Sequence, residues 1–293
     1  AAHRRAPEAI DGRTDRTMPK PYFLYTYRAA SGALAGRPEG APFAVIAHRG
    51  ASADYPENTL VSFAAAIAEG ADMVELDVQL TSDGEVVVFH DEKISRTTNG
   101  RGRVGEHTFL QLRRLDAGSW FNKKFRGEKI PLLAEVLDLC KDRIAVNVEI
   151  KTEAVTDAAS DGIEEKTLTI VDRAGMREHV VFSSFDPRAV LHVKQIDAAR
   201  AVAVLFEKKY YGTAAPSRVV EQLGADAFNC SWRELDAAWL LDLKQAGIPV
   251  HVYTVNTPGR MKRLIKMGVE GIFTNRPAVL KKVLEDSWSK MKP

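Results

Sequence analysis

Short β-branched segments alternate with longer helix-like segments along this chain, from Phe43 onward. Nine segments are predicted to be strands: 43–48, 72–78, 86–90, 144–150, 180–184, 201–205, 225–229, 249–255 and 269–273. Between most of them apolar residues recur at i, i+3 and i+4, the spacing of an amphipathic helix, as in 59–69, 161–174, 236–246 and 258–267. Strand–helix–strand repetition predicts parallel strands with helices packed outside them.

One pair of strands is too close in sequence for a crossover helix. The residues between 72–78 and 86–90 include Asp83-Gly84, a pair typical of a two-residue type I′ hairpin turn. If those two residues form the loop, the register places His90 opposite Asp77. The remaining eight strands suit an α/β fold of the TIM (β/α)8 barrel type, with the ninth as a β-hairpin arm over the barrel mouth. An open doubly wound sheet is the alternative.

The chain is expected to form a single TIM-barrel domain over 42–293. Residues 91–143 are the longest break in the alternation, and we expect a small insertion there that follows the hairpin arm and caps one end of the barrel. Residues 1–41 have mixed charge, few apolar side chains and no clear period, so they are expected to form a disordered leader.

Composition excludes several classes of protein. Lys and Arg total 41 against 39 Asp and Glu, a net charge of +2 that does not indicate a nucleic-acid partner. No stretch approaches the roughly 20 apolar residues of a transmembrane segment. The two cysteines, Cys140 and Cys230, lack metal-binding spacing and are expected to be reduced thiols. We expect a cytoplasmic location, and a periplasmic or secreted one if a signal peptide has been removed.

Three carboxylates are predicted to meet in the barrel mouth. Strand 72–78 carries Glu75 and Asp77, and strand 144–150 carries Glu149, all facing the lumen because residues two apart in a strand share a face. An unpaired close pair would repel by about 4 kcal/mol, so either their pKa values rise or a cation binds. Carboxylate oxygens favour a hard divalent ion, Mg²⁺ or Ca²⁺. The alternative is an ordinary ion-pair cluster in which Arg49 and Lys151 neutralise the acids.

Two histidines lie at strand ends beside these acids. His48 ends the first predicted strand, and His90 ends the hairpin arm. Histidine exchanges protons near neutral pH, and a well-placed acid or base contributes a rate factor of roughly 10²–10⁴. With Arg49 and Lys151 to hold anionic oxygens, this set predicts phosphoryl-ester cleavage, in which one histidine acts as base and the other as acid.

Spaced motifs carry a resemblance to a known family. They are HRG (48–50), ENT (57–59), ELD (75–77), DG (83–84), HD (90–91), EIK (149–151), VYTVNT (252–257) and GIFTNRP (271–277). Over about residues 43–284 the chain resembles the glycerophosphodiester phosphodiesterase family, in particular its compact bacterial members.

The resemblance implies a TIM barrel and a metal-dependent hydrolysis of glycerophosphodiesters to glycerol 3-phosphate and an alcohol. It implies that His48 and His90 are the catalytic acid–base pair. The implied metal ligands are Glu75, Asp77 and Glu149. The implied substrate-binding and site-bracing residues are Arg49, Glu57, Asn58, Lys151, Phe185 and Tyr253. At Tyr253 many members carry tryptophan, so the aromatic wall beside the glycerol gains a hydroxyl here.

Two other functions fit the same residues. A lysophospholipase D or sphingomyelinase-D-like lipid phosphodiesterase would use the same histidines and metal, and would need an apolar groove for acyl chains. Its membrane contacts would be the aromatic segment 21–27 and Trp288. A barrel that binds a phospho-ligand without catalysis is the third possibility, but it predicts the loss of a catalytic group, and none is missing.

Overall fold

The protein is described by a computed structural model that covers residues 43–289. The predicted leader at 1–41, the aromatic segment 21–27 and the side chain of Trp288 lie outside the described residues. The strands are β1 (Ala44–His48), β2 (Met73–Leu80), β3 (Val86–Val88), β4 (Ala145–Ile150), β5 (Val180–Ser184), β6 (Ala201–Leu205), β7 (Ala227–Ser231), β8 (Val250–Tyr253) and β9 (Gly271–Thr274). All nine predicted strands are present.

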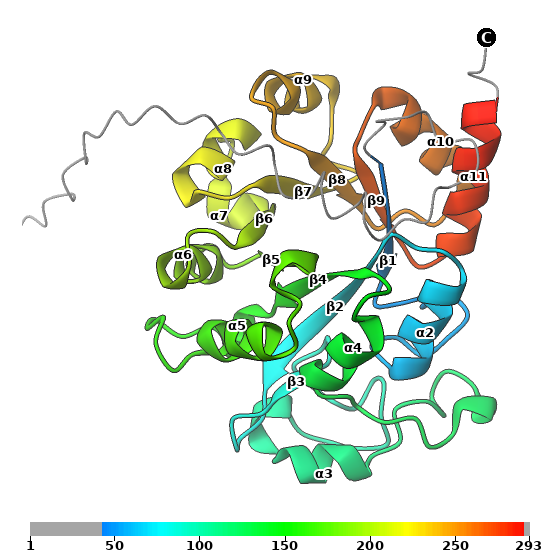
Figure 1. Ribbon diagram of the computed structural model, residues 1–293, viewed down its shortest axis with the longest axis vertical. Helices are drawn as coiled ribbons and strands as arrows, with labels where there is room; N and C mark the ends of the chain where they lie inside the picture. Colours follow the sequence, from blue (N-terminus) through cyan, green and yellow to red (C-terminus); the bar gives the residue numbers. More distant parts are fainter. Residues whose placement is uncertain (1–42, 290–293) are drawn as a thin grey trace, which may run out of the picture.

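Eight of these strands form a closed parallel barrel, as predicted (Figure 1). The strands follow in the order β1-β9-β8-β7-β6-β5-β4-β2, and β2 pairs with β1 to close the ring. His48 of β1 lies opposite Glu75 of β2, and Ala44 lies opposite Gly271 of β9. Because the ring is closed, the open doubly wound sheet is excluded.

Helices between the strands surround the barrel (Figure 1). They are α2 (Leu60–Ala68), α4 (Leu133–Cys140), α5 (Ile163–Arg173), α6 (Pro187–Ile196), α7 (Lys208–Tyr211), α8 (Pro216–Leu223), α9 (Ala237–Gln245), α10 (Pro258–Met267) and α11 (Pro277–Ser289). Polar side chains begin several of them: Thr59 and Asp236 accept backbone N–H bonds in the first turns of α2 and α9. Within residues 43–289, every helix is too short or too polar to cross a bilayer.

Side-chain alternation divides the core into two parts. Leu76 and Ile150 belong to the large cluster between the strands and the surrounding helices. Ile46, Met73 and Phe273 belong to a smaller cluster that also contains several alanines and is formed by the opposite strand faces, inside the barrel. Both free cysteines are buried in the outer cluster. The lumen floor is therefore apolar, and polar side chains fill the lumen above it.

The hairpin register differs from the prediction by one residue. Val78 lies opposite Val88, and the N–H of Phe89 donates to the carbonyl of Asp77 at 2.9 Å. Phe89, not His90, is therefore opposite Asp77, and the predicted pairing of Asp77 with His90 is wrong.

The cause is a three-residue loop in place of the predicted two-residue turn. The N–H of Thr81 bonds the carbonyl of Glu85 at 3.0 Å, so residues 82–84 form the loop. A type I′ turn needs positive φ at both central residues, but within this loop only Gly84 has positive φ, at +80°. The Thr81 hydroxyl stabilises the longer loop, since it donates to Asp83 at 2.6 Å and accepts from the Glu85 N–H at 2.9 Å.

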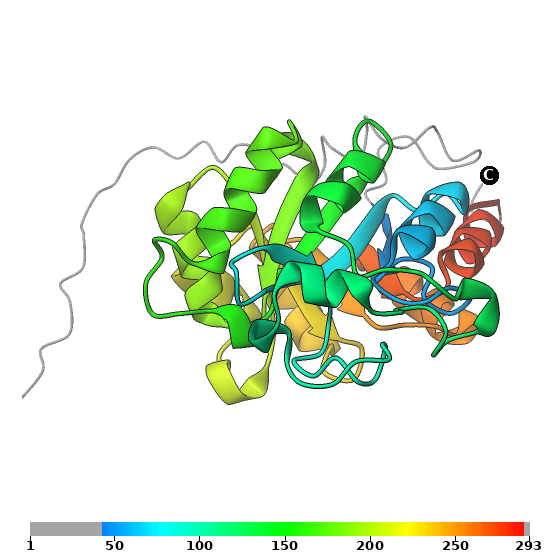
Figure 2. The ribbon, with the colours of Figure 1, turned by 90° about the horizontal axis from the view of Figure 1, so that it is seen from below.

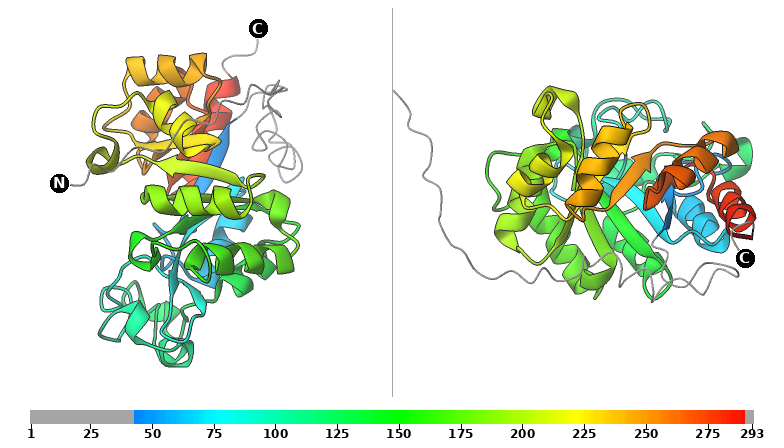
Figure 3. Two further views of the ribbon diagram at one scale, coloured as in Figure 1. Left: turned by 90° about the vertical axis from the view of Figure 1, so that its left-hand side faces the viewer. Right: turned by 90° about the horizontal axis from the view of Figure 1, so that it is seen from above.

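The segment after the arm packs beside the barrel. It contains the short helix α3 (Phe109–Arg114). The helix and the loops on either side of it face the viewer in Figure 2, and the whole segment lies at the lower end of the molecule in the left view of Figure 3. Val86 and Val88 of β3 point into the outer core, whereas Val87 joins a separate cluster with Ile94 and Leu112. One face of β3 thus packs against this segment, and the other face packs into the outer core of the barrel.

Candidate active site

Three buried carboxylates converge at the carboxyl ends of β2 and β4. One oxygen each from Glu75, Asp77 and Glu149 lies within 4.8 Å of the others. Asp77 is directly opposite Glu149 in the parallel register, and Glu75 precedes Asp77 by two residues on the same strand face. Their exposed fractions are 3%, 0% and 9%. The sequence-based expectation that these acids meet in the lumen is borne out geometrically.

Two cations contact the acids without balancing their charge. Arg49 Nε lies 3.4 Å from Asp77 Oδ2, and Lys151 Nζ lies 2.7 Å from Glu149 Oε1 and 3.5 Å from Asp77 Oδ1. The predicted ion pairs are therefore present. Three carboxylates face two cations, so one negative charge remains if all three acids are ionised.

The pKa shifts of the three acids reflect their burial first and the neighbouring charges second. Burial raises the pKa of Glu75 well above its usual value, and the charges of Asp77 and Glu149 raise it further. Burial also raises the pKa of Glu149, although Lys151 opposes the shift. Burial alone would raise the pKa of Asp77, but Arg49 and Lys151 hold it below its ordinary range.

The cluster suits a divalent metal ion. Asp77 Oδ1 is buried and accepts no hydrogen bond, so it is available as a ligand. The donor set is oxygen only, which matches Mg²⁺ or Ca²⁺ better than zinc. A cation there would also remove the repulsion that raises the pKa of Glu75. The residues therefore fit a metal on their chemistry and their burial.

His48 lies at the end of β1, where a side chain from the last strand orients it. Its Nδ1 is 2.8 Å from Asn275 Oδ1. Since that amide oxygen only accepts, Nδ1 carries the proton and Nε2 is left for chemistry. Burial and the neighbouring Arg49 lower the pKa of His48 to about 4, so the ring is neutral near pH 7.

His90 reaches the site from a turn after β3. Gln79 Nε2 donates to the carbonyls of Phe89, His90 and Asp91 at 3.0, 3.1 and 2.8 Å, which fixes the backbone of that turn. The Nδ1 of His90 donates to Asp91 Oδ1 at 2.6 Å. His90 lies close enough to His48, Asp77 and Glu149 to affect their pKa values, so it lies near the same mouth although the predicted pairing is wrong.

Backbone strain places the arginine beside the acids. Arg49 has φ +56°, a conformation that non-glycine residues rarely adopt and that is typical of functional sites. Its N–H donates to Glu75 Oε2 at 2.9 Å, and its Nη1 donates to Glu57 Oε1 at 2.9 Å. Gly50 follows at φ +86°, where an added Cβ would lie 2.7 Å from the Ser62 backbone. The turn therefore requires this glycine.

Asn58 connects the first loop to the acid cluster. Its Nδ2 donates to Asp77 Oδ2 at 2.8 Å, and its N–H donates to the carbonyl of Arg49 at 3.1 Å. Asn58 also has φ +56°, which asparagine tolerates better than most residues.

An aromatic pair lies on the other side of the mouth. Phe185 follows β5 and Tyr253 ends β8, and their ring centroids are 5.9 Å apart in an edge-to-face arrangement. The Tyr253 hydroxyl donates to the carbonyl of Phe206 at 3.0 Å. The predicted extra hydroxyl is therefore bound to the protein's own backbone.

Sequence reasoning missed three residues that hold the predicted ones. Asn275 orients His48, Gln79 fixes the turn that carries His90, and Arg96 bonds both Glu57 and Asp91. Asn275 lies within the GIFTNRP motif, directly after the last strand. It could have been found by considering the polar residues that follow the carboxyl end of each strand. Arg96 lies in an irregular loop with no period to indicate its direction.

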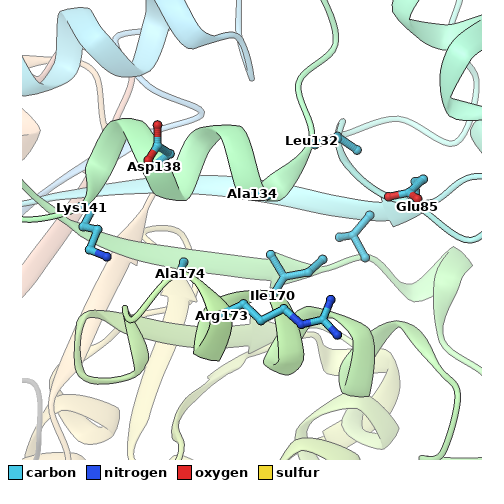
Figure 4. Close-up of a pocket in the computed structure, with 9 residues that line it drawn as sticks. Glu85, Leu132, Ala134, Asp138, Lys141, Ile170, Arg173 and Ala174 are labelled. Atoms are coloured by element: carbon cyan, nitrogen blue, oxygen red, sulfur yellow. The ribbon is translucent and has the colours of Figure 1, made fainter.

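The cavity drawn in Figure 4 is separate from this site. It has a volume of about 450 Å³ and lies between α4 and α5, beside the start of β3. Its lining includes Glu85, Asp138, Lys141, Ile170 and Arg173, and it contains none of the site residues.

Comparisons with known proteins agree with this geometry. The model of the glycerophosphoryl diester phosphodiesterase family matches residues 48–279. A glycerophosphodiester phosphodiesterase of Caldanaerobacter subterraneus is 38% identical over 237 residues, which cover 80% of this chain and 95% of that protein. One from Bacillus subtilis is 34% identical over 253 residues, covering 81% of this chain and 85% of that protein.

Solved structures show the same similarity. An Oleispira antarctica phosphodiesterase, solved in complex with the product sn-glycerol-3-phosphate, has a TM-score of 0.75 and is 28% identical; the match covers 82% of this chain and 96% of that one. A glycerophosphodiester phosphodiesterase of Agrobacterium tumefaciens has a TM-score of 0.72 and is 27% identical, covering 82% and 99% of the two chains.

Proposed function

This chain belongs to the glycerophosphoryl diester phosphodiesterase family, and on that basis we propose a metal-dependent, histidine-catalysed hydrolysis of glycerophosphodiesters to glycerol 3-phosphate and an alcohol. The observation that carries the proposal is the convergence of His48 and His90 on one mouth with the buried acid triad. The product bound to the Oleispira antarctica relative supports the choice of substrate class.

Glu75, Asp77 and Glu149 are proposed to hold the metal ion, Mg²⁺ or Ca²⁺. Such an ion supplies positive charge against the negative oxygens of the reacting phosphate. Arg49 and Lys151 already contact the acids at the same strand ends, and their charged groups are proposed to bind the phosphate oxygens.

The two imidazoles are proposed to divide the proton transfers. His48 is neutral near pH 7 because it is buried, so it suits accepting a proton from the attacking hydroxyl or water. His90, whose Nδ1 is bonded to Asp91, then donates a proton to the leaving alkoxide. The bond from each Nδ1 to a fixed oxygen leaves both Nε2 atoms for these transfers.

Glu57, Asn58 and the aromatic pair complete the proposed substrate site. Glu57 orients Arg49, and Asn58 connects the first loop to Asp77. Phe185 and Tyr253 are proposed to contact the apolar face of the glycerol. A lipid phosphodiesterase is not favoured, because the curated relatives reported above are glycerophosphodiester phosphodiesterases.

A substrate panel tests the proposal. Purified protein is incubated with glycerophosphocholine, glycerophosphoethanolamine and lysophosphatidylcholine, each with Mg²⁺ or Ca²⁺, and released glycerol 3-phosphate and alcohol are quantified. We expect turnover of the two water-soluble diesters with at least one metal. Inactivity on both, or faster hydrolysis of lysophosphatidylcholine, would overturn the assignment.

A further inference from the structure

We propose that Arg96 is a positioning residue of this site. It joins the carboxylate of Glu57, which bonds Arg49, to the carboxylate of Asp91, which bonds His90. The inference rests on the proposed function, because Arg49 and His90 are there the phosphate-binding and proton-transfer groups.

The guanidinium of Arg96 bonds two carboxylates at once. Its Nη1 and Nη2 donate to Glu57 Oε2 and Oε1 at 3.0 and 2.7 Å. Its Nη2 also donates to Asp91 Oδ1 at 3.0 Å, and its Nε donates to Asp91 Oδ2. Each carboxylate therefore receives two N–H bonds from one planar group, an arrangement that only arginine can make.

The same carboxylate oxygens hold the proposed functional groups. Glu57 Oε1, which accepts from Arg96, also accepts from Arg49 Nη1 at 2.9 Å. Asp91 Oδ1, which accepts from Arg96, also accepts from His90 Nδ1 at 2.6 Å. One continuous chain of charge-assisted hydrogen bonds thus runs from the arginine at the end of β1 to the histidine after β3.

The fold explains why such a link is needed. Glu57 lies in the loop between β1 and α2, whereas Asp91 and Arg96 lie in the segment that follows β3. The last backbone bond between the arm and β2 is that of Phe89 to Asp77, one residue before His90. The sheet therefore does not fix the imidazole directly, and contacts outside it must set the distance between the two loops.

Substitution of Arg96 separates this role from general stability. We expect Arg96→Gln to lower kcat for glycerophosphocholine by roughly 10–100-fold, the usual cost of losing a group that orients a reacting residue. Arg96→Lys keeps the positive charge but cannot make the paired guanidinium bonds to both carboxylates, so we expect most of the same loss of kcat. Full kcat in the lysine variant would show that charge alone matters and would overturn the positioning role.

Arg177→Gln is the matched control. The Arg177 side chain is 41% exposed, against 45% for Arg96, and it also contacts two aspartates, Asp172 and Asp197, but it precedes β5 at the opposite end of the barrel. We expect its removal to lower the melting temperature about as much as Arg96→Gln and to leave kcat within about twofold of wild type. An equal loss of kcat in both variants would contradict a local role for Arg96.

A mutant cycle tests whether Arg96 acts through its two partners. In a Glu57→Ala, Asp91→Ala background, Arg96→Gln should cost less than about threefold in kcat, because the bonds it acts through are already lost. A full independent loss in that background would overturn the mechanism.

A readout independent of turnover separates failure of this inference from failure of the proposed function. In ¹⁵N-labelled wild type we expect a protected His90 Nδ1–H signal in the NMR spectrum, and in Arg96→Gln we expect it to exchange rapidly with solvent. Wild type that hydrolyses no glycerophosphodiester but shows this difference would refute the function and support the link. Active wild type whose His90 signal is the same in Arg96→Gln would refute the link.

Discussion

Asp77 and Glu149 lie directly opposite each other on β2 and β4, and Lys151 Nζ reaches both carboxylates, at 3.5 and 2.7 Å. The lysine alone cannot neutralise both acids, and Glu75 adds a third carboxylate to the same cluster. The cluster therefore contains more carboxylates than cations, which favours binding of a divalent ion. We propose that this cluster binds the metal ion and that the two histidines carry out the proton transfers.

Replacement of either histidine tests that division of roles. We expect His48→Ala and His90→Ala each to lower kcat by roughly 10²–10⁴-fold, because each removes one proton transfer. The measurement is kcat for glycerophosphocholine, with circular dichroism to confirm folding. His179→Ala, before β5 at the other end of the barrel, is the control and should keep wild-type kcat. A near-normal rate in a folded His48 or His90 variant removes that residue from its role.

The Tyr253 hydroxyl is predicted to serve the fold and not the substrate. It donates to the carbonyl of Phe206, so Tyr253→Phe should lower the free energy of unfolding by about 1 kcal/mol, the typical value of one hydrogen bond. kcat/KM for glycerophosphocholine should stay within about twofold of wild type. Tyr253→Ala removes the ring as well and should raise KM. A tenfold loss of kcat/KM in the phenylalanine variant would mean that the hydroxyl contacts substrate.

Two histidines with lowered pKa values, His48 and His251, predict a fall in stability as the pH is lowered. Burial lowers the pKa of His251 to about 4, and burial with the Arg49 charge lowers that of His48 to about 4. An unfolded histidine titrates near 6.5, so between these values mainly the unfolded chain takes up the proton. The free energy of unfolding should therefore be at its full value above pH ~6.5. At lower pH it should decrease, by up to about 1.4 kcal/mol per pH unit for each histidine.

Urea unfolding at two pH values, about 7.5 and about 5, measures this slope. His251→Gln should reduce the difference between the two pH values, because one of the two histidines no longer titrates. Leu241→Gln, which changes an exposed side chain and no titratable group, is the control, and its slope should equal that of wild type. An unchanged slope in His251→Gln would contradict the burial-induced shift.

The barrel and the acid triad could be predicted because both depend on regular periods. Strand alternation places Glu75, Asp77 and Glu149 on the lumen face, and parallel pairing brings neighbouring strand ends together. Loop geometry has no such period. Asp83-Gly84 favours a two-residue turn, but the Thr81 hydroxyl stabilises a loop one residue longer, which shifts the register of the whole arm.

His90 is selected as a site residue from a predicted strand register that is wrong by one residue. The expected pairing with Asp77 is wrong, yet His90 lies near the acids, where Gln79 fixes the turn after β3 and Asp91 holds Nδ1. Arg96 could not be predicted, because its bonds to Glu57 join two loops that are far apart in sequence. Such contacts depend on the finished fold.

Metal dependence is the central claim, and a chelation experiment tests it most directly. Protein dialysed against EDTA is assayed on glycerophosphocholine before and after addition of Mg²⁺ or Ca²⁺, with Glu75→Gln treated in parallel. We predict that chelation abolishes hydrolysis, that at least one of these ions restores it in wild type, and that the variant recovers little. Undiminished hydrolysis in excess chelator would contradict the claim.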